Sequence, residues 1–336
     1  MEKQFRVVRV DGMATSDPMV EETEELAKVK AELVRTDCVT EDEIIEAAKD
    51  ADAIITSGAQ ITRRVMETLL KCKVIVRTGV GFDTLDVDAA TDNGIIVVTL
   101  PTFCTEEVAN HTIALLLTCS RKLIILNNSI KQGNWAESRQ AMLSMGSIYG
   151  QTLGLVGCGN IGRMVARKAQ CFDLRILGND PYVDTSRARW NGITLVSLPE
   201  LLKESDFVSI HTPLNKETRH LIGEKEFKQM KPTAFFFNAA RGPIVDEAAL
   251  IKALQEKWIA GAGLDVFEKE PVAPDNPLLK MDNVVLTPHS AFYSTASSER
   301  QGRTSGQEIA RVFSGRWPKS VVNQLVKPKV NLVWED

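Results

Sequence analysis

The sequence predicts an α/β protein with two domains, each built around a doubly wound parallel sheet. Short apolar runs alternate with helical stretches along most of the chain, which is typical of βαβ units. The middle of the chain has a glycine-rich turn between an apolar run and a helical pattern, as in nucleotide-binding folds. The length of 336 residues is sufficient for two hydrophobic cores.

The first part of the chain contains short β-rich runs separated by helical stretches. One helix is expected to begin after Thr40, because Thr40 and Glu43 have the spacing of a capping box. We find no glycine-rich phosphate motif here, so this domain is expected to supply substrate contacts. The predicted strands are Phe5–Val10, Leu33–Thr36, Ala53–Thr56, Val74–Arg77 and Ile95–Val98.

A long helix is expected to start near Thr105 and to continue past Ser120, with apolar residues at helical spacing. A second parallel sheet follows it. After that sheet, a polar helical segment is expected at Thr295–Phe313. The predicted strands of the second sheet are Leu153–Val156, Leu174–Leu177, Thr194–Val196, Phe207–Ile210, Ala234–Phe237, Ile259–Leu264 and Val284–Leu286.

The glycine-rich turn has the pattern G-x-G-x-x-G, formed by Gly157, Gly159 and Gly162. Such glycines permit a tight turn and let backbone N–H groups approach a pyrophosphate at a helix N-terminus. Asp180 lies 18 residues after Gly162, at the end of the next apolar run. An acid at this place suits a ribose with free hydroxyls, and Pro181 follows it instead of an arginine. The pattern therefore predicts NAD rather than NADP.

Three polar residues follow later strand-like runs. Arg241, Glu270 and His289 come after Ala234–Phe237, Ile259–Leu264 and Val284–Leu286, respectively. Ligands of open parallel sheets bind outside the carboxyl ends of the strands, so these three side chains are expected to converge on one crevice.

These motifs, in this order, resemble the D-isomer-specific 2-hydroxyacid dehydrogenases over nearly the whole chain. The segments 79–83 (GVGFD), 106–112 (EEVANHT) and 211–214 (HTPL) add to the resemblance. The tail after His289 departs from the commoner His-Ile-Ala/Gly-Gly pattern of the family. Its aromatic pair, Phe292 and Tyr293, looks like the branch near the C-terminal-binding-protein corepressors.

The resemblance gives each polar residue an expected role in reducing a 2-oxo acid. His289 is the candidate for proton transfer, and a carboxylate on its other ring nitrogen would fix the tautomer and favour the imidazolium. Glu270 fits that carboxylate by the family's Glu-Pro motif, while Glu268 is the competitor that spacing alone does not exclude. Arg241 would bind the substrate carboxylate in a bidentate pair.

Further contacts are implied for substrate and cofactor. Val80 and Gly81 would donate backbone N–H groups to the substrate carboxylate, and Phe292 either faces the substrate or packs at a hinge. Asp265 could cap a turn, although the resemblance places it at the nicotinamide carboxamide. The expected cofactor contacts are Gly157, Gly159, Asn160, Ile161, Gly162, Asp180, Pro181, His211, Thr212, Pro213, Thr218, Ala239, Ala240, Arg241, Asp265, His289 and Ala291.

The family's organisation implies a Rossmann NAD-binding domain at 104–293, inserted into a discontinuous, flavodoxin-like substrate domain at 1–103 and 294–336. The two crossings, near Phe103 and Phe292, would act as hinges. The family also implies a homodimer, with the helix after Thr105 at its interface. Two other histidines, His111 and His220, are expected to be a structural helix residue and a surface residue.

Composition narrows the function classes. The net charge is −4, with no basic block that would indicate a nucleic-acid surface. No apolar stretch reaches the length of a membrane span, and we see no signal peptide, so a cytoplasmic protein is expected. The six cysteines have neither zinc nor disulfide spacing and are expected to be buried or half-buried thiols. Cys158, in the glycine turn, is read as a small packing side chain, with a redox switch as the alternative.

We therefore expect an NAD-dependent dehydrogenase that interconverts a 2-oxo acid and a D-2-hydroxy acid without a metal. One alternative is an NAD-sensing scaffold like the corepressors, which retain the same Arg-Glu-His set. Another is oxidation of a different small anion, such as formate or phosphite, although Glu270 argues against formate. The sequence leaves open the identity of the 2-oxo acid and the physiological direction.

Overall fold

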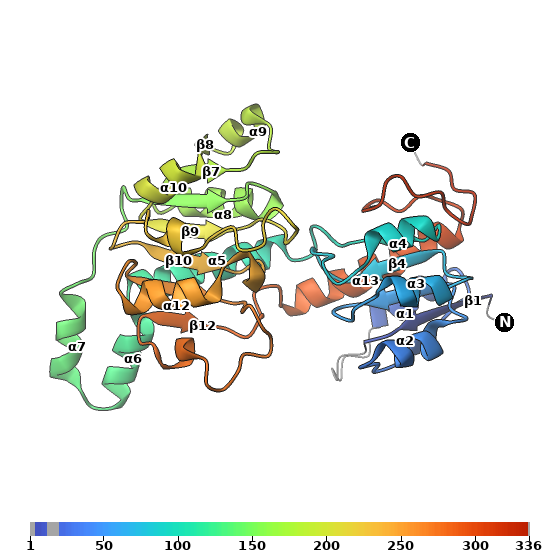
Figure 1. The fold of residues 1–336 in the computed structure, drawn as a ribbon, viewed down its shortest axis with the longest axis horizontal. Coiled ribbons are helices and arrows are strands. Elements are labelled where there is room, and N and C mark those ends of the chain that lie inside the picture. Colours follow the sequence, from blue (N-terminus) through green and yellow to red (C-terminus); the bar gives the residue numbers. More distant parts are fainter. Residues whose placement is uncertain (1–3, 12–19, 335–336) are drawn as a thin grey trace. The chain divides into compact units, whose positions relative to one another are not determined.

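The computed structural model describes residues 4–11 and 20–334, and the chain divides into two compact units. Unit 1 comprises Met1–Phe103 and Ser294–Asp336, and unit 2 comprises Cys104–Tyr293. Each unit contains one parallel sheet flanked by helices, which confirms the predicted α/β class (Figure 1).

The sheet of unit 1 has five parallel strands in the order β2-β1-β3-β4-β5. Fully buried Val8, Ile54, Ile75 and Val97 lie on four neighbouring strands and form part of its core. The strands are β1 (Phe5–Arg9), β2 (Ala31–Arg35), β3 (Ala53–Thr56), β4 (Val74–Arg77) and β5 (Ile96–Val98). The helices are α1 (Val20–Ala27), α2 (Glu41–Ala48), α3 (Arg63–Thr68), α4 (Val87–Asp92) and α13 (Thr295–Phe313).

Two local predictions for unit 1 are confirmed. The Thr40 side chain accepts a hydrogen bond from the Glu43 N–H, and the Glu43 carboxylate accepts one from the Thr40 N–H. This capping box starts α2 at Glu41. Helix α13 has the predicted bounds and packs against α1, so a segment from the end of the chain completes the first unit.

The sheet of unit 2 has seven parallel strands in the order β12-β11-β10-β9-β6-β7-β8. The order reverses between β6 and β9, and such a switch point is where open α/β sheets bind ligands. The strands are β6 (Thr152–Val156), β7 (Arg175–Asn179), β8 (Thr194–Leu195), β9 (Phe207–Ile210), β10 (Phe235–Asn238), β11 (Gly261–Leu264) and β12 (Val284–Leu286).

Helices and short 3₁₀ turns connect the strands of unit 2. Helix α5 packs against α8 and lies along β10 and β11, where Leu115 and Leu116 are buried. The elements are α5 (Thr105–Ser120), α6 (Leu123–Lys131), α7 (Trp135–Met142), α8 (Asn160–Gln170), α9 (Thr185–Trp190), α10 (Leu198–Glu204), α11 (Glu224–Phe227), η1 (Gly242–Ile244), α12 (Glu247–Gln255) and η2 (Pro277–Lys280).

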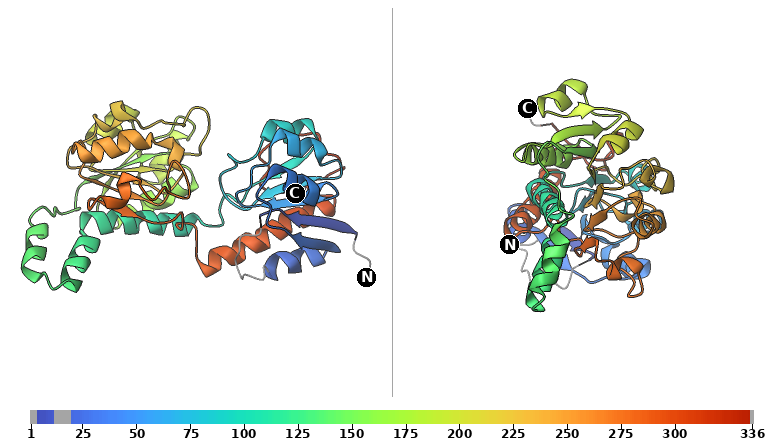
Figure 2. Two further views of the ribbon diagram at one scale, coloured as in Figure 1. Left: turned by 60° about the horizontal axis from the view of Figure 1, so that its bottom comes forward. Right: turned by 90° about the vertical axis from the view of Figure 1, so that its left-hand side faces the viewer.

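The long helix ends earlier than the sequence predicted. It stops at Ser120 rather than continuing past it, because Lys122 adopts a left-handed conformation with φ of 50°. Helix α6 then leaves α5 at an angle of 61°. Together with α7 it projects from the body of unit 2 (Figures 1 and 2). In the part of the chain that the structure describes, no single helix is long and apolar enough to cross a membrane.

Candidate active site

The glycine turn follows β6 and has the strained geometry that only glycine accommodates. Gly157 has a φ of +97°, and a Cβ there would lie 2.7 Å from the carbonyl carbon and oxygen of His211. A Cβ on Gly162 would lie 2.2 Å from the Gly157 carbonyl oxygen. The first glycine is therefore required by the turn and by the neighbouring β9 end, and the third by close packing of the helix on the turn.

The middle glycine borders open space. Gly159 is the N-cap of α8, it makes no side-chain cap hydrogen bond, and a Cβ on it would meet no atom within 4 Å. Arg163 braces the turn by donating to the Cys158 carbonyl at 2.9 Å and to the Asn160 side chain at 2.8 Å. Open backbone at a helix N-terminus is what a pyrophosphate requires, so the residues present fit a dinucleotide.

Asp180 connects the glycine turn to the end of β7. Its Oδ2 accepts a hydrogen bond from the Cys158 N–H at 2.8 Å, and its Oδ1 accepts one from the Tyr182 N–H at 2.9 Å. The strand extends to Asn179, two residues beyond the prediction, so Asp180 directly follows it. The carboxylate thus lies beside the glycine turn that follows β6, and a ribose is expected at this place from the sequence.

The opposite side of the switch point is formed by the segment after β9. The His211 N–H donates to the Val156 carbonyl at 2.7 Å, and its ring Nε2 lies 2.9 Å from the Ser209 hydroxyl oxygen. Burial lowers the pKa of His211 to about 4, so its ring is neutral at physiological pH. The Thr218 hydroxyl donates to the Pro213 carbonyl at 2.6 Å and holds the loop that follows.

Arg241 lies in a short loop held by a buried asparagine. Asn238, at the end of β10, donates from its side chain to the Arg241 carbonyl at 2.9 Å and accepts from the Ala240 N–H at 3.0 Å. A Cβ on the following Gly242 would lie 1.8 Å from the Phe267 carbonyl oxygen. The loop that carries Arg241 is therefore in direct backbone contact with the loop after β11.

His289 and Glu270 form a close pair. His289 Nδ1 lies 2.7 Å from Glu270 Oε2, and Glu270 Oε1 accepts a hydrogen bond from the Phe267 N–H at 3.0 Å. Partial burial opposes ionisation of Glu270, but the hydrogen bonds from His289 and the Phe267 N–H outweigh it and lower the pKa of this carboxyl. The carboxylate therefore engages Nδ1 of the ring, not Nε2.

Glu268, the competing carboxylate, has other partners. Its Oε1 lies 2.6 Å from His220 Nε2, and its Oε2 accepts a hydrogen bond from the Glu247 N–H at 3.2 Å. His220 is partly exposed at the surface, as expected, with 41% of its side chain accessible. Of the two carboxylates, the geometry pairs Glu270 with His289.

Asp265 is fully buried and organises the turn that carries His289. Its Oδ1 accepts from the Thr287 hydroxyl at 2.6 Å and from the Ser290 N–H at 2.9 Å, and its Oδ2 accepts from the Ala291 N–H at 2.9 Å. His289 itself has a left-handed φ of 53°. These bonds give Asp265 the turn-capping geometry, while its contact with the carboxamide stays a prediction.

His111 reaches the same turn from α5. Its Nε2 lies 2.9 Å from the Thr287 hydroxyl oxygen and 3.6 Å from Asp265 Oδ1. This helix residue thus supports the turn, as a structural histidine would.

The aromatic pair after His289 begins beside the histidine ring. The centroid of Phe292 lies 6.3 Å from that of His289, at an interplanar angle of 81°, and Tyr293 is 63% exposed. Val80 and Gly81, whose N–H groups are predicted to donate to the substrate carboxylate, follow β4 in unit 1. The residue before them, Gly79, accepts a hydrogen bond from the Leu100 N–H through its carbonyl.

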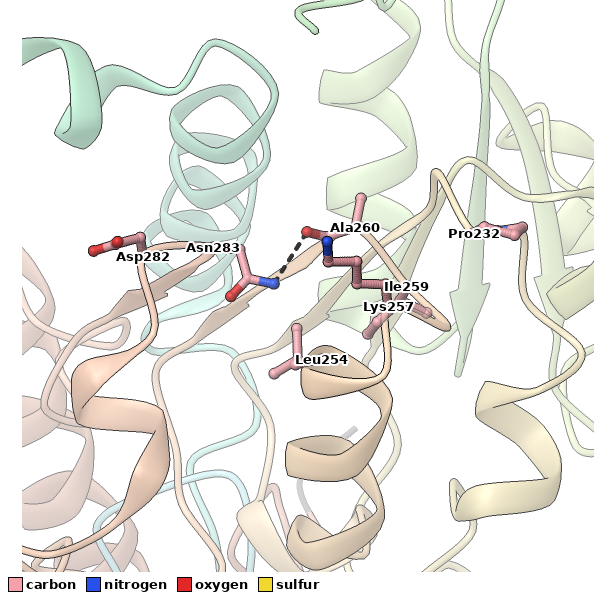
Figure 3. Close-up of a pocket in the computed structure, with 7 residues that line it drawn as sticks. All are labelled: Pro232, Leu254, Lys257, Ile259, Ala260, Asp282 and Asn283. Carbon is pink, nitrogen blue, oxygen red and sulfur yellow. Dashed lines mark hydrogen bonds between the residues drawn. The ribbon is translucent and has the colours of Figure 1, made fainter. Parts of the chain in front are cut away.

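A cavity of about 450 Å³ lies at the amino ends of β10, β11 and β12 in unit 2 (Figure 3). Pro232, Ala260 and Asn283 line it, and each precedes a strand instead of following one. Since ligands of open parallel sheets bind at the carboxyl ends, this cavity is not the candidate active site. Within residues 4–11 and 20–334, no group of three or more His, Cys, Asp or Glu side chains is arranged to hold a metal.

Several residues that shape the site are not among those predicted from the sequence. Asn238, Thr287 and Glu247 each support a loop with a predicted functional residue, and none has a motif of its own. Asn238 had a usable signal, because a buried polar residue at a strand end must find hydrogen-bond partners nearby.

Comparisons with known proteins identify the family. The model of the D-isomer specific 2-hydroxyacid dehydrogenase NAD binding domain matches residues 113–291. A glyoxylate reductase of Korarchaeum cryptofilum is 42% identical over 84% of this chain and 86% of its own length. A D-3-phosphoglycerate dehydrogenase of Methanocaldococcus jannaschii is 39% identical over 94% of this chain, which spans only 60% of that relative.

Solved structures give the same result. The D-lactate dehydrogenase of Aquifex aeolicus, in complex with NAD and lactic acid, has a TM-score of 0.81 and 31% identity, covering 92% of this chain and 96% of that one. An NADPH-dependent glyoxylate/hydroxypyruvate reductase of Sinorhizobium meliloti, in complex with NADP and malonate, has a TM-score of 0.85 and 29% identity, covering 98% and 99%. The chain therefore belongs to the D-isomer specific 2-hydroxyacid dehydrogenases, and it is an oxidoreductase with a binding domain for a nicotinamide dinucleotide.

Proposed function

We propose that this dehydrogenase interconverts a 2-oxo acid and a D-2-hydroxy acid, with His289 as the proton donor and acceptor. The observation that carries the proposal is the 2.7 Å pair between His289 Nδ1 and Glu270 Oε2, next to a loop in contact with that of Arg241. An imidazole oriented by a carboxylate is suited to general acid–base catalysis.

Each residue has one task in this scheme. The Arg241 guanidinium binds the substrate carboxylate through two parallel hydrogen bonds and orients the carbonyl. His289 donates a proton from Nε2 to the carbonyl oxygen during reduction and takes it back during oxidation. Glu270 holds the imidazolium through Nδ1. A nicotinamide dinucleotide held at the glycine turn would supply a hydride for the carbonyl carbon, and with the proton from His289 the C=O would become a CH–OH. The N–H groups of Val80 and Gly81 are proposed as further carboxylate donors.

The proposed cofactor is NAD. The glycine turn would hold the pyrophosphate, and the Asp180 carboxylate would accept hydrogen bonds from the adenosine ribose and repel a 2′-phosphate. Both NAD and NADP occur in the similar structures, so the support for NAD comes from Asp180 and from Pro181. The other proposed contacts are those of the sequence analysis, among them Thr212, Pro213 and Thr218 after β9, Ala239 and Ala240 after β10, and Ala291 after His289.

The substrate proposal follows from the small, anionic compounds that the similar proteins are named for. Glyoxylate reductases and D-3-phosphoglycerate dehydrogenases both act beside a carboxylate, which is the group that Arg241 would bind. Phe292 adds an apolar face next to His289, and we propose that it contacts the substituent of the 2-oxo acid.

A second candidate function is a scaffold that senses NAD, as the C-terminal-binding-protein corepressors do. The observation that favours it is the exposed aromatic side chain of Tyr293. Turnover separates the two. We expect NADH to be consumed in steady state with at least one member of a panel containing glyoxylate, hydroxypyruvate, phosphohydroxypyruvate and phenylpyruvate, and chiral analysis to show the D product. Tight NADH binding without turnover of any 2-oxo acid would favour the scaffold.

We also propose a homodimer formed through α5, α6 and α7. No residue of α6 is buried in the chain, and apolar side chains are exposed along the two projecting helices. These side chains are Leu123, Ile124, Ile130, Trp135 and Met142, with Leu143 just after α7. Light scattering should give twice the monomer mass, and Trp135→Asp should reduce it, whereas Trp190→Asp on α9 should not. A monomeric wild-type protein would contradict the dimer.

A further inference from the structure

We propose that Glu268 is a positioning residue that holds the Glu270 loop and the Arg241 loop in register, through a clamp with Glu247 and His220. The inference rests on the proposed function of His289 and Glu270. It assigns a task to the carboxylate that does not touch His289.

The clamp consists of two glutamates that bind each other's backbone. Glu268 Oε2 accepts from the Glu247 N–H at 3.2 Å, and Glu247 Oε2 accepts from the Glu268 N–H at 2.9 Å. Glu247 begins α12, directly after the segment of Arg241, and Glu268 lies in the loop after β11. Asn276 donates to Glu247 Oε1 at 2.7 Å and fixes that carboxylate from its other side. The two elements are therefore joined by reciprocal hydrogen bonds.

A third loop is attached through His220. Its Nε2 lies 2.6 Å from Glu268 Oε1, and its backbone N–H donates to the Pro243 carbonyl at 2.9 Å. His220 has a left-handed φ of 51°, which the loop maintains through these two contacts. Arg219 Nη2 lies 3.8 Å from the same carboxylate oxygen. Glu268 is thus the point at which the loops after β9, β10 and β11 meet.

The backbone of Phe267, which precedes Glu268, transmits this arrangement to the site. The Phe267 N–H holds Glu270 Oε1 at 3.0 Å, and the Phe267 carbonyl is the group that a Cβ on Gly242 would strike. Glu268 fixes the peptide that follows Phe267 through its own N–H and side chain. A shift of Glu268 would therefore move Phe267 and displace the support of Glu270 and the backbone neighbour of Gly242 together. Errors of about 1 Å in such positions can lower rates by about 100-fold.

The cluster around Glu268 differs from an ordinary surface ion pair in its burial and in its hydrogen bonds to the backbone. The Glu268 side chain is 28% exposed and accepts a backbone N–H from another element. In contrast, the pair of Lys228 with Glu224 lies along one short helix with exposures of 53% and 43%. Exposed ion pairs such as that of Lys228 with Glu224 contribute little to folding stability. Hydrogen bonds between backbone groups and partly buried carboxylates, in contrast, hold two elements in a fixed position relative to each other.

The test compares Glu268→Ala and Glu268→Gln with Lys269→Gln as the matched control from the same loop. Glu268→Ala removes both acceptors, and we expect kcat to fall about 10-fold while the KM for NADH changes by less than about twofold. Glu268→Gln keeps an amide oxygen for the Glu247 N–H and should restore most of the rate. Lys269→Gln should match the wild type. Glu247→Ala, which breaks the clamp from its other side, should reproduce Glu268→Ala and replaces it if that variant does not fold.

A double-mutant cycle with Glu270→Gln shows whether Glu268 acts through Glu270. If it does, Glu268→Ala should lower kcat in the Glu270→Gln background by much less than about 10-fold. A wild-type kcat in both Glu268→Ala and Glu247→Ala would overturn the clamp, and fully additive losses would overturn its action through Glu270. If Glu270→Gln alone leaves kcat and its pH profile unchanged, the proposed function fails instead, so the two failures are distinct.

Discussion

Replacing Glu270 with glutamine tests the proton-transfer pair most directly. The amide keeps the size of the side chain and an oxygen for His289 Nδ1 but removes the negative charge. Reduction requires the protonated imidazole, so the rate of 2-oxo acid reduction should fall toward alkaline pH. Without the carboxylate the imidazolium is less stable, and the alkaline limb of the profile should move to lower pH.

The geometry sets the size of this shift. Opposite charges about 4 Å apart attract by about 1 kcal/mol in bulk water and by about 4 kcal/mol at an effective dielectric constant of about 20. The His289 and Glu270 side chains are 40% and 36% exposed, so water screens much of their attraction. We therefore expect a loss near the lower limit, about 1.4 kcal/mol, which corresponds to about one pH unit.

The assay is the pH dependence of kcat at saturating NADH for the wild type, Glu270→Gln and Lys269→Gln. NADH affinity, measured separately, should be retained in all three proteins. An alkaline limb that stays in place in Glu270→Gln would refute the reasoning. So would a shift in Glu268→Gln without one in Glu270→Gln, because the carboxylate coupled to His289 would then be the other one.

The same pair has a consequence for folding stability. The pKa of Glu270 is lowered in the folded protein, so its ionised form stabilises the fold at pH values above the ordinary carboxyl pKa of 4.5. This contribution is lost as pH falls through the lowered folded value. The difference in thermal midpoint between the wild type and Glu270→Gln should therefore be present at neutral pH and disappear in acid.

Three further outcomes are expected. Asp180→Ala should reduce the preference for NADH over NADPH, and equal catalytic efficiency with both cofactors in the wild type would contradict the assignment. Phe292→Ala should lower catalytic efficiency for bulky 2-oxo acids more than for glyoxylate, by about 0.8 kcal/mol for each methylene buried, whereas a uniform loss would return Phe292 to a packing role. Burial, assisted by the negative charge of Asp180, raises the pKa of Cys158 to about 12, so a thiol reagent should modify Cys171 in the native protein and leave Cys158 intact. The exposure of Cys171 contradicts the expectation that all the thiols are buried or half-buried. Modification of Cys158 in the native protein would support the alternative of a redox switch.

The sequence was sufficient wherever a structure depends on neighbouring residues. The capping box at Thr40 starts α2 because both hydrogen bonds close within one helical turn. The glycine turn could be recognised because Gly157 requires a left-handed backbone that other residues rarely adopt. Helix α13 was predicted with its actual bounds from a continuous helical pattern. The alternation of strands and helices likewise indicated two parallel sheets.

Tertiary structure decided between alternatives that the local sequence allows equally, such as where a helix ends and which of two glutamates pairs with a histidine. Helix α5 ends at Ser120 although the apolar residues Leu123–Leu126 follow, because Lys122 adopts a left-handed conformation that the composition of this segment does not indicate. Glu268 and Glu270 are two residues apart in one loop and have the same chemistry, so spacing could not select the partner of His289. Glu268 contacts Glu247 and His220, and Glu270 contacts His289. These partners come from distant parts of the chain and meet only once β9, β10, β11 and β12 are aligned in the sheet.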